Sequence, residues 1–514
     1  METLNRKMNY AAFWPAYIIL IVFIICGVFF QKAVGSFLNT ALYGMADIVG
    51  WYINLLSLIA VILAFVVLLM KYGDVKIGGK DAKPDFKMFN WCAMSICGGI
   101  GTGLLFWAMG EPIFHFATPP VGAGVEPFSR EAGIFAVSQA MWDWSFVQYA
   151  MYSLCAVAFG LAVYNRKKPL SFGSVINGAF GRDLPKLETV IHGFTIFCLC
   201  GAVANSMGVG LMQIGAGVES VFGIAQSPVI WLIAATAIAF VFILSCVSGL
   251  GNGLKKLSTF TIIVFLAILV YVFIFGDTKF MTKIGTEAVG NILDNFGKKT
   301  VMNNTMADGD NWPADWIIQY WASFIVYAPV IGMFLSRLAK GRTVKQFVLV
   351  NLFVPSLFCW VWIAIFGGMT ISLQTTGAVD VWDAVNNLGM QATVFQILAS
   401  LPLGEILTVV FLIAVFGSFC TLADPMAAVL ATVSVRGLSV DDEAPRKLKI
   451  LMGVTISAMS YLLVASGGVN SVKGMFVIVG LPISLILILC IVAAFKQMKT
   501  CYQNQIAVNA EKGE

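Results

Sequence analysis

The chain has 514 residues, of which 59% are hydrophobic and only 11% are charged, with a net charge of +5. Soluble domains contain about 25% charged residues, so this composition excludes a sizeable soluble domain and indicates a polytopic membrane protein. The excess of basic residues lies in short loops between apolar runs, which argues against a nucleic-acid partner.

The segment of about ten residues before the first apolar run is short and carries Arg6 and Lys7. No small-residue cleavage site follows that run, which predicts a retained helix rather than a signal peptide. Apolar runs of about 20 residues are long enough to cross a bilayer. Twelve such runs follow along the chain: 12–32, 50–70, 90–110, 135–163, 190–217, 228–248, 257–276, 315–336, 346–371, 404–433, 449–467 and 473–495.

Most of the 32 Lys and Arg residues fall in alternate loops on the side of the N-terminus. The positive-inside rule therefore predicts a multi-pass protein of the cell (inner) membrane with both termini in the cytoplasm. The loop 277–314 would lie outside, and the spacing of its apolar residues over 286–296 predicts a short amphipathic helix on the outer surface.

Two of the predicted spans contain residues that weaken a helix. The third carries four glycines between Gly98 and Gly103, and the eighth carries Pro329 and Gly332. Close helix packing through small residues is one explanation. Interrupted spans at corresponding positions of two halves are instead typical of a transporter binding site. Spans 3–7 and 8–12 would then form two inverted repeats of five helices.

Several motifs together resemble the betaine/carnitine/choline transporter family over nearly the whole chain. They are Gly99-Ile100-Gly101-Thr102-Gly103 with Gly110-Glu111-Pro112 and Thr118-Pro119-Pro120, Trp144 with Tyr152, Ser248-Gly249-Leu250-Gly251, Tyr320-Trp321-Ala322 with Gly332-Met333-Phe334, and Thr421 with Ala423 and Asp424. The resemblance implies an all-α membrane protein with twelve transmembrane helices in a LeuT-type inverted repeat, usually a homotrimer.

The same resemblance implies secondary transport of a quaternary-ammonium or zwitterionic solute. It implies a protein without a cofactor and without enzymatic activity. The expected organisation is an N-terminal tail with two accessory helices (1–89), a first repeat (90–276), the extracytoplasmic loop (277–314), a second repeat (315–495) and a cytoplasmic tail (496–514).

The expected substrate site lies between spans three, four and eight. Aromatic faces hold a trimethylammonium group by cation–π attraction, worth roughly 0.5–2 kcal/mol per ring. Where the family usually has two Trp residues, this chain has Ser323 and Phe324. The candidate substrate-binding residues are Trp321, Tyr327, Phe324, Ser323, Trp144, Tyr149, Phe114, Gly99, Gly101 and Gly103. Core packing is the alternative for each aromatic residue.

Four residues bear on coupling. Sodium-coupled members use adjacent Thr and Ser hydroxyls in span ten, but here Leu422 follows Thr421 and offers only its backbone oxygen to a hard cation. Lys255 occupies the place of the Arg that the family's sodium-independent carnitine/γ-butyrobetaine exchanger uses. These substitutions favour sodium-independent exchange, with a sodium- or proton-coupled symporter as the alternative and an ordinary loop lysine as the simpler explanation of Lys255.

Asp143 lies between two Trp residues about ten residues into span four, where the family more often has His. A carboxylate at that depth is a candidate for carrying a proton or pairing with a cation, or it could cap a helix break or bond Gln139 one turn earlier.

Other classes fit less well. The two histidines, His115 and His192, are far apart in the sequence, and no catalytic or metal-ligating constellation surrounds them, so neither an enzyme nor a metal site is expected. A channel needs a continuous polar pathway, and a non-transporting sensor needs a signalling domain for which the short termini leave little room.

Overall fold

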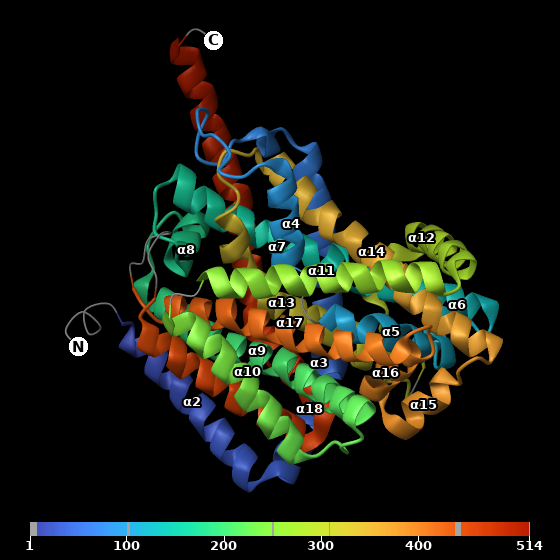
Figure 1. The fold of residues 1–514 in the computed structure, drawn as a ribbon. Coiled ribbons are helices and arrows are strands. Elements are labelled where there is room, and N and C mark those ends of the chain that lie inside the picture. The colour runs from blue at the N-terminus through green and yellow to red at the C-terminus, as the bar shows by residue number, and fades with distance from the viewer. Residues whose placement is uncertain (1–7, 100–102, 249–250, 308, 437–443, 513–514) are drawn as a thin grey trace.

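The computed structural model describes residues 8–99, 103–248, 251–307, 309–436 and 444–512, and Figure 1 shows them as a packed assembly of long helices. No strand occurs in these residues. Their β-type pairing is limited to the two isolated bridges Met8–Val435 and Lys76–Thr343. The chain is therefore an all-α integral membrane protein, as its composition predicts.

The helices follow one another along the chain with short connections. They are α2 (Tyr10–Phe29), α3 (Gln31–Leu69), η1 (Lys71–Asp74), α4 (Met88–Gly99), α5 (Gly103–Ala117), η2 (Val121–Ala123), α6 (Arg130–Asp143), α7 (Phe146–Gly160), η3 (Leu161–Asn165), α8 (Phe172–Phe180), α9 (Pro185–Phe222), α10 (Pro228–Ser248), α11 (Gly251–Phe275), α12 (Thr278–Val301), η4 (Ala314–Ile318), α13 (Gln319–Ser336), α14 (Val344–Thr376), α15 (Val381–Leu388), α16 (Met390–Ala399), α17 (Gly404–Val433) and α18 (Arg446–Lys512).

Nine helices within the described part of the chain are long and apolar enough to cross a membrane, or ten if the bent pair α11 and α12 counts as one span. Each of the first ten predicted spans coincides with a helix or a helix pair, and the last two both lie in α18, on either side of its kink at Gly467 and Gly468. Three predicted spans are not among the nine helices. The third is split into α4 and α5, the sixth corresponds to α10, which is shortened within the described residues, and the seventh corresponds to α11, which is bent against α12. The count of twelve stays a prediction.

The broken helix of span four lies at the centre of the assembly. The most apolar stretch between Arg130 and Asn165 is buried throughout, whereas most of α2 is exposed, and Figure 1 shows α2 and α10 at the periphery. A helix that is apolar all round belongs inside a bundle or against lipid. Span four is therefore inside the protein, and α2 is on the surface that faces lipid.

The prediction that the eighth span is interrupted at Pro329 and Gly332 is wrong. Helix α13 runs without a break from Gln319 to Ser336 and contains Pro329, and its one irregularity is the π-helical turn η4 that precedes it. Gly332 serves close packing instead, because a Cβ there would lie 2.5 Å from the Cβ of Cys155 in α7. A membrane helix tolerates Pro where neighbours re-satisfy the backbone.

The interruption expected in the third span falls on residues 100–102, which lie outside the described residues; α4 ends at Gly99 and α5 begins at Gly103. Two further breaks occur, one in span four, where a helix break was an alternative for Asp143, and one in α18 between the predicted spans 449–467 and 473–495. Span four is divided between Asp143 and Phe146, where Ser145 has φ −128° and ψ −117°. Helix α18 bends at Gly468, whose φ of 60° favours glycine.

The loops contain more helix than the sequence pattern indicates. Helix α12 is 24 residues long, more than twice the predicted segment 286–296, and it meets α11 at an angle of 107°. Helices α8, α15 and α16 lie in connections where none was predicted. All three are short, and an apolar periodicity over eight to ten residues is too brief to distinguish from a loop.

Candidate functional site

One face of α13 carries a row of aromatic residues. Tyr320, Phe324 and Tyr327 are spaced by four and three residues and so share this face. The rings of Tyr320 and Phe324 stack, with centroids 6.1 Å apart and an interplanar angle of 9°. Trp107 of α5 meets Tyr320 edge-on at 5.9 Å.

The break in span four places Trp144 against this face. Its ring lies 5.2 Å from that of Tyr320 and 5.9 Å from that of Phe324. Gly103 makes room for it, because a Cβ at Gly103 would lie 2.7 Å from the Trp144 ring. We call Trp107, Trp144, Tyr320 and Phe324 the aromatic cage.

The cage has the chemistry to hold a quaternary ammonium group. Such a group has no hydrogen-bond donor, and aromatic faces within about 6 Å attract it through their quadrupoles. The rings of Trp144, Tyr320 and Phe324 are in mutual contact, so a ligand must separate them to enter. Entry of such a group into the cage would therefore require movement of α13 or of the turn between α6 and α7.

The carboxylate of Glu111 lies directly beside the cage. Its Oε2 accepts hydrogen bonds from Trp144 Nε1 at 2.8 Å and from the Tyr320 hydroxyl at 2.7 Å. Glu111 is fully buried, where hydrogen bonds to an ionised group are strong. Glu111 thus holds two cage rings in place and puts a carboxyl group beside them.

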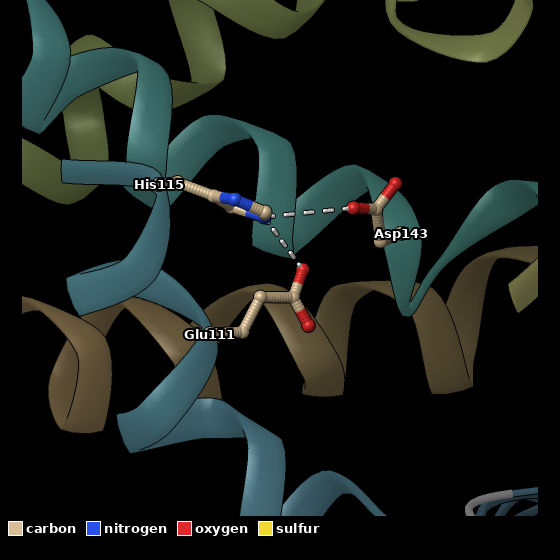
Figure 2. A group of neighbouring side chains, drawn as sticks. All are labelled: Glu111, His115 and Asp143. Atoms are coloured by element: carbon tan, nitrogen blue, oxygen red, sulfur yellow. Dashed lines mark hydrogen bonds and ion pairs between the residues drawn. The ribbon is translucent and has the colours of Figure 1, made fainter. Parts of the chain in front are cut away.

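Figure 2 shows Glu111, His115 and Asp143 pointing toward one another from α5 and the end of α6. His115 Nε2 is 3.2 Å from Glu111 Oε1 and 4.0 Å from Asp143 Oδ2, and all three side chains are fully buried. We call these residues the Glu111–His115–Asp143 cluster. Gln139 Nε2 donates to Asp143 Oδ1 at 2.8 Å, which confirms the predicted contact with Gln139.

Two buried lysines neighbour the cluster. Lys299 of α12 donates to Ser138 Oγ at 2.7 Å and lies over the Phe135 ring. Burial lowers the pKa of the Lys299 ammonium to about 7, and the charge of Asp143 acts in the opposite direction. Lys473 of α18 is 3.4 Å from Asp315 Oδ1 and lies over the Trp316 ring.

Of the predicted aromatic residues, Trp144 and Phe324 lie in the cage. Trp321 lies on another face of α13, where its N–H donates to the carbonyl oxygen of Thr300 and its ring meets that of Phe324 at 6.0 Å. The Tyr327 hydroxyl bonds Ser206 and donates to the carbonyl oxygen of Ala202, both in α9.

Three further candidates occupy other surroundings. The Tyr149 hydroxyl is 3.6 Å from Cys359 Sγ in α14, and Phe114 packs against Trp316 and Trp382. The Ser323 hydroxyl donates to the Tyr320 carbonyl oxygen at 2.8 Å, so only its lone pairs remain for a ligand.

Among the glycines, only Gly103 can be placed against the cage. Gly101 lies outside the described residues, and Gly99 is the last residue of α4.

The coupling candidates are only partly described. Thr421 Oγ1 donates to the carbonyl oxygen of Ser418 at 2.9 Å, and Leu422 is half-buried beside it. The backbone of Lys255 is part of α11, but its side chain is not among the side chains that the structure describes.

The sequence reasoning missed Glu111 and Tyr320 as site residues, although both stood in the motifs. A signal was present, because Glu111 and His115 are spaced i, i+4 in an apolar helix and so share one face.

A cavity of about 390 Å³ opens at the end of the molecule where the basic loops gather. Its lining includes His192 of α9, Met333 of α13, and Arg436 just after α17. These three helices also carry Ser206, Tyr327 and Thr421 nearer the middle of the assembly. The cavity is therefore a candidate vestibule between this end of the molecule and the site.

Comparison with known proteins agrees with this description. The sequence model described as "BCCT, betaine/carnitine/choline family transporter" matches residues 11–503. A probable glycine betaine transporter of Desulfitobacterium hafniense is 29% identical over 92% of this chain and 93% of its own length. The osmo-dependent choline transporter BetT2 of Acinetobacter baylyi is 26% identical over 96% of this chain and 72% of its own length.

An ectoine/hydroxyectoine transporter of Virgibacillus pantothenticus is 28% identical over 97% of both chains. Among solved structures, a sodium-coupled sialic acid symporter in its outward-open state is 12% identical, with a TM-score of 0.33 over 78% of this chain and 85% of its own.

Proposed function

This chain belongs to the betaine/carnitine/choline family, whose members are transporters and not enzymes, and from that premise we propose that it exchanges small quaternary-ammonium or zwitterionic solutes across the membrane without sodium. Betaine and choline, which the names of two relatives specify, both carry a trimethylammonium group. The proposed mechanism is alternating access around the aromatic cage.

The observation that carries the proposal is the cage with Glu111 beside it. Trp144, Tyr320 and Phe324 offer ring faces, and the buried carboxylate holds two of these rings in place. A positive group without donors fits between such faces. The anionic end of a zwitterion would meet the backbone near Gly103, where α5 begins and the N-terminal end of a helix favours negative charge.

The absence of sodium coupling is proposed from three residues. Leu422 contributes no side-chain oxygen, which leaves Thr421 as the single hydroxyl of the family's adjacent pair. A hard cation requires several oxygen ligands. Lys255 would supply a fixed positive charge instead, as the family's carnitine exchanger does with its arginine. A sodium- or proton-coupled symporter is the second candidate.

Counterflow in proteoliposomes tests this proposal. Vesicles loaded with unlabelled glycine betaine, choline or γ-butyrobetaine are placed in labelled solute, with sodium and then with potassium as the only alkali cation. We expect the same rate of labelled uptake in both salts, and uptake only into preloaded vesicles. A rate that collapses in potassium, or uptake into empty vesicles that follows an imposed proton gradient, would replace exchange by symport.

The remaining proposals concern assembly and orientation. We propose a homotrimer from the family resemblance, and cytoplasmic termini from the distribution of Lys and Arg along the chain. In this orientation the cavity lined by His192 and Arg436 faces the cytoplasm.

A further inference from the structure

Three potential ligand atoms converge in the Glu111–His115–Asp143 cluster. His115 offers one nitrogen and the two carboxylates one oxygen each, and these atoms all lie within 4.8 Å of one another. The nitrogen is 3.2 Å from the Glu111 oxygen and 4.0 Å from the Asp143 oxygen. Bonds of about 2.0–2.2 Å in a tetrahedral site put ligand atoms about 3.3–3.6 Å apart, so small side-chain movements close this set around an ion.

Each carboxylate divides its two oxygens between two tasks. Glu111 uses Oε2 to accept from Trp144 and Tyr320, and leaves Oε1 toward His115. Asp143 uses Oδ1 to accept from Gln139 and leaves Oδ2 toward His115. Metal-ligating carboxylates have this arrangement, in which surrounding donors hold one oxygen and orient the other toward the ion.

One of the atoms that face one another lacks a hydrogen-bond partner. Asp143 Oδ2 has none among the described residues although Asp143 is fully buried, whereas Glu111 Oε1 is hydrogen-bonded to His115 Nε2. The other ring nitrogen of His115, Nδ1, is also without a partner among these residues. A buried carboxylate oxygen without a partner is costly, so such atoms in a native structure indicate an absent ion or water. Figure 2 shows the free side of Asp143 directed at the imidazole ring.

We propose that Glu111, His115 and Asp143 bind one divalent first-row transition-metal ion, with zinc the best match. The proposal goes beyond solute transport and does not depend on it. One imidazole and two carboxylates are a mixed nitrogen and oxygen set of the kind that zinc accepts with a fourth position open. The two carboxylates neutralise the divalent charge in a site that excludes water.

Magnesium and calcium suit this set less well, because both prefer six or more oxygen ligands. Here only three protein ligands are present among the described residues, and one of them is a nitrogen. The ion would draw the three side chains together. Since Glu111 also holds Trp144 and Tyr320, an occupied site would fix one wall of the aromatic cage.

Metal binding by the purified full-length protein tests the proposal. The protein carries an affinity tag without histidine, is treated with a chelator in detergent, and is then titrated with cobalt(II), whose visible absorption reports coordination number and ligand type. We expect one cobalt per chain with a four- or five-coordinate spectrum lacking sulfur charge-transfer bands, and displacement by zinc. Elemental analysis gives the stoichiometry independently.

Three substitutions and a matched control locate the ion. Asp143→Asn and His115→Gln are expected to weaken binding more than about 100-fold, and Gln139→Leu, which removes only the donor to Asp143, about 10- to 100-fold. His192→Gln removes the other of the two histidines, which is buried between α9 and the end of α17, and is expected to bind as the unmodified chain does.

The opposite results overturn the proposal. One is that the unmodified chain shows no stoichiometric metal binding, as expected for a cluster that holds only a proton or a sodium ion. The other is that metal binding survives His115→Gln and is lost in His192→Gln. If the ligand variants do not fold, X-ray absorption of the cobalt-loaded unmodified chain still decides. Nitrogen and oxygen neighbours including an imidazole support the site, and sulfur neighbours from the chain's 11 cysteines contradict it.

Discussion

At the scale of single residues, Glu111 connects the two parts of the site. One of its oxygens holds two rings of the aromatic cage, and the other faces His115. Trp144 and Phe324 were identified from the sequence because aromatic residues in a transporter motif suggest cation binding. Glu111 and Tyr320 were not, because the hydrogen bonds from Trp144 and Tyr320 to Glu111 join segments far apart in the chain, and the i, i+4 spacing of Glu111 and His115 was the one local signal.

Replacing Trp144 by Leu removes one cage ring and keeps an apolar side chain of moderate size. One cation–π contact is worth roughly 0.5–2 kcal/mol, so the dissociation constant for glycine betaine or choline is expected to rise about 2- to 30-fold. Isothermal titration or tryptophan fluorescence of the purified protein measures it.

Trp142→Leu is the matched control. Trp142 is two residues away on the other side of Asp143, and its N–H donates to Thr300 Oγ1 in α12 rather than to Glu111. We expect its affinity for the solute to be unchanged. Equal losses in both variants would show that Trp144 acts through packing alone.

At the scale of elements, the sequence located the spans well and their irregularities poorly. Apolar length marks a span, and each predicted span lies in a helix or helix pair, the last two of them together in α18. Pro329 and Gly332 suggested a break in α13, but Gly332 instead allows α7 to approach. The real break at Ser145 has no Pro or Gly within two residues, so composition could not reveal it.

The substitution Gly332→Ala tests the packing role. The added Cβ would lie 2.5 Å from Cys155 Cβ and 3.0 Å from the backbone nitrogen of Ala156. Overpacking of this kind costs typically about 1–3 kcal/mol, so the thermal unfolding temperature in detergent is expected to fall by several degrees.

Gly290→Ala is the control for this change, because a Cβ at Gly290 in α12 meets no atom within 4 Å. Alanine is the better helix former, so this variant is expected to be at least as stable as the unmodified chain. If Gly332→Ala behaves in the same way, α7 and α13 are not in the close contact described.

At the scale of the whole molecule, the all-α membrane class followed from composition and spacing. The low charge and the regular apolar runs are properties that any twelve-span sequence displays. The additional helices α8, α15 and α16 were missed because their periodic segments are short. The predicted inverted repeats of spans 3–7 and 8–12 remain a prediction, since the sequence shows no internal identity and α13 lacks the matching break.

Four buried ionisable side chains lie near the site. Glu111, Asp143, Lys299 and Lys473 are all at least nine-tenths buried, and each is placed by a different helix, α5, α6, α12 or α18. Ionisable groups inside a membrane protein are rare and usually functional. Their convergence beside the aromatic cage supports solute binding at this point between spans three, four and eight.

The central claim is that the cage selects a methylated cationic group. Competition for labelled glycine betaine bound to the purified protein measures this directly, with carnitine, choline, γ-butyrobetaine, a dimethylsulfonio compound and unmethylated amino acids as competitors. We predict displacement by the methylated compounds and none by glycine or γ-aminobutyrate at the same concentrations. Equal or stronger displacement by the unmethylated amino acids would contradict the account, because such ammonium groups require hydrogen-bond acceptors rather than ring faces.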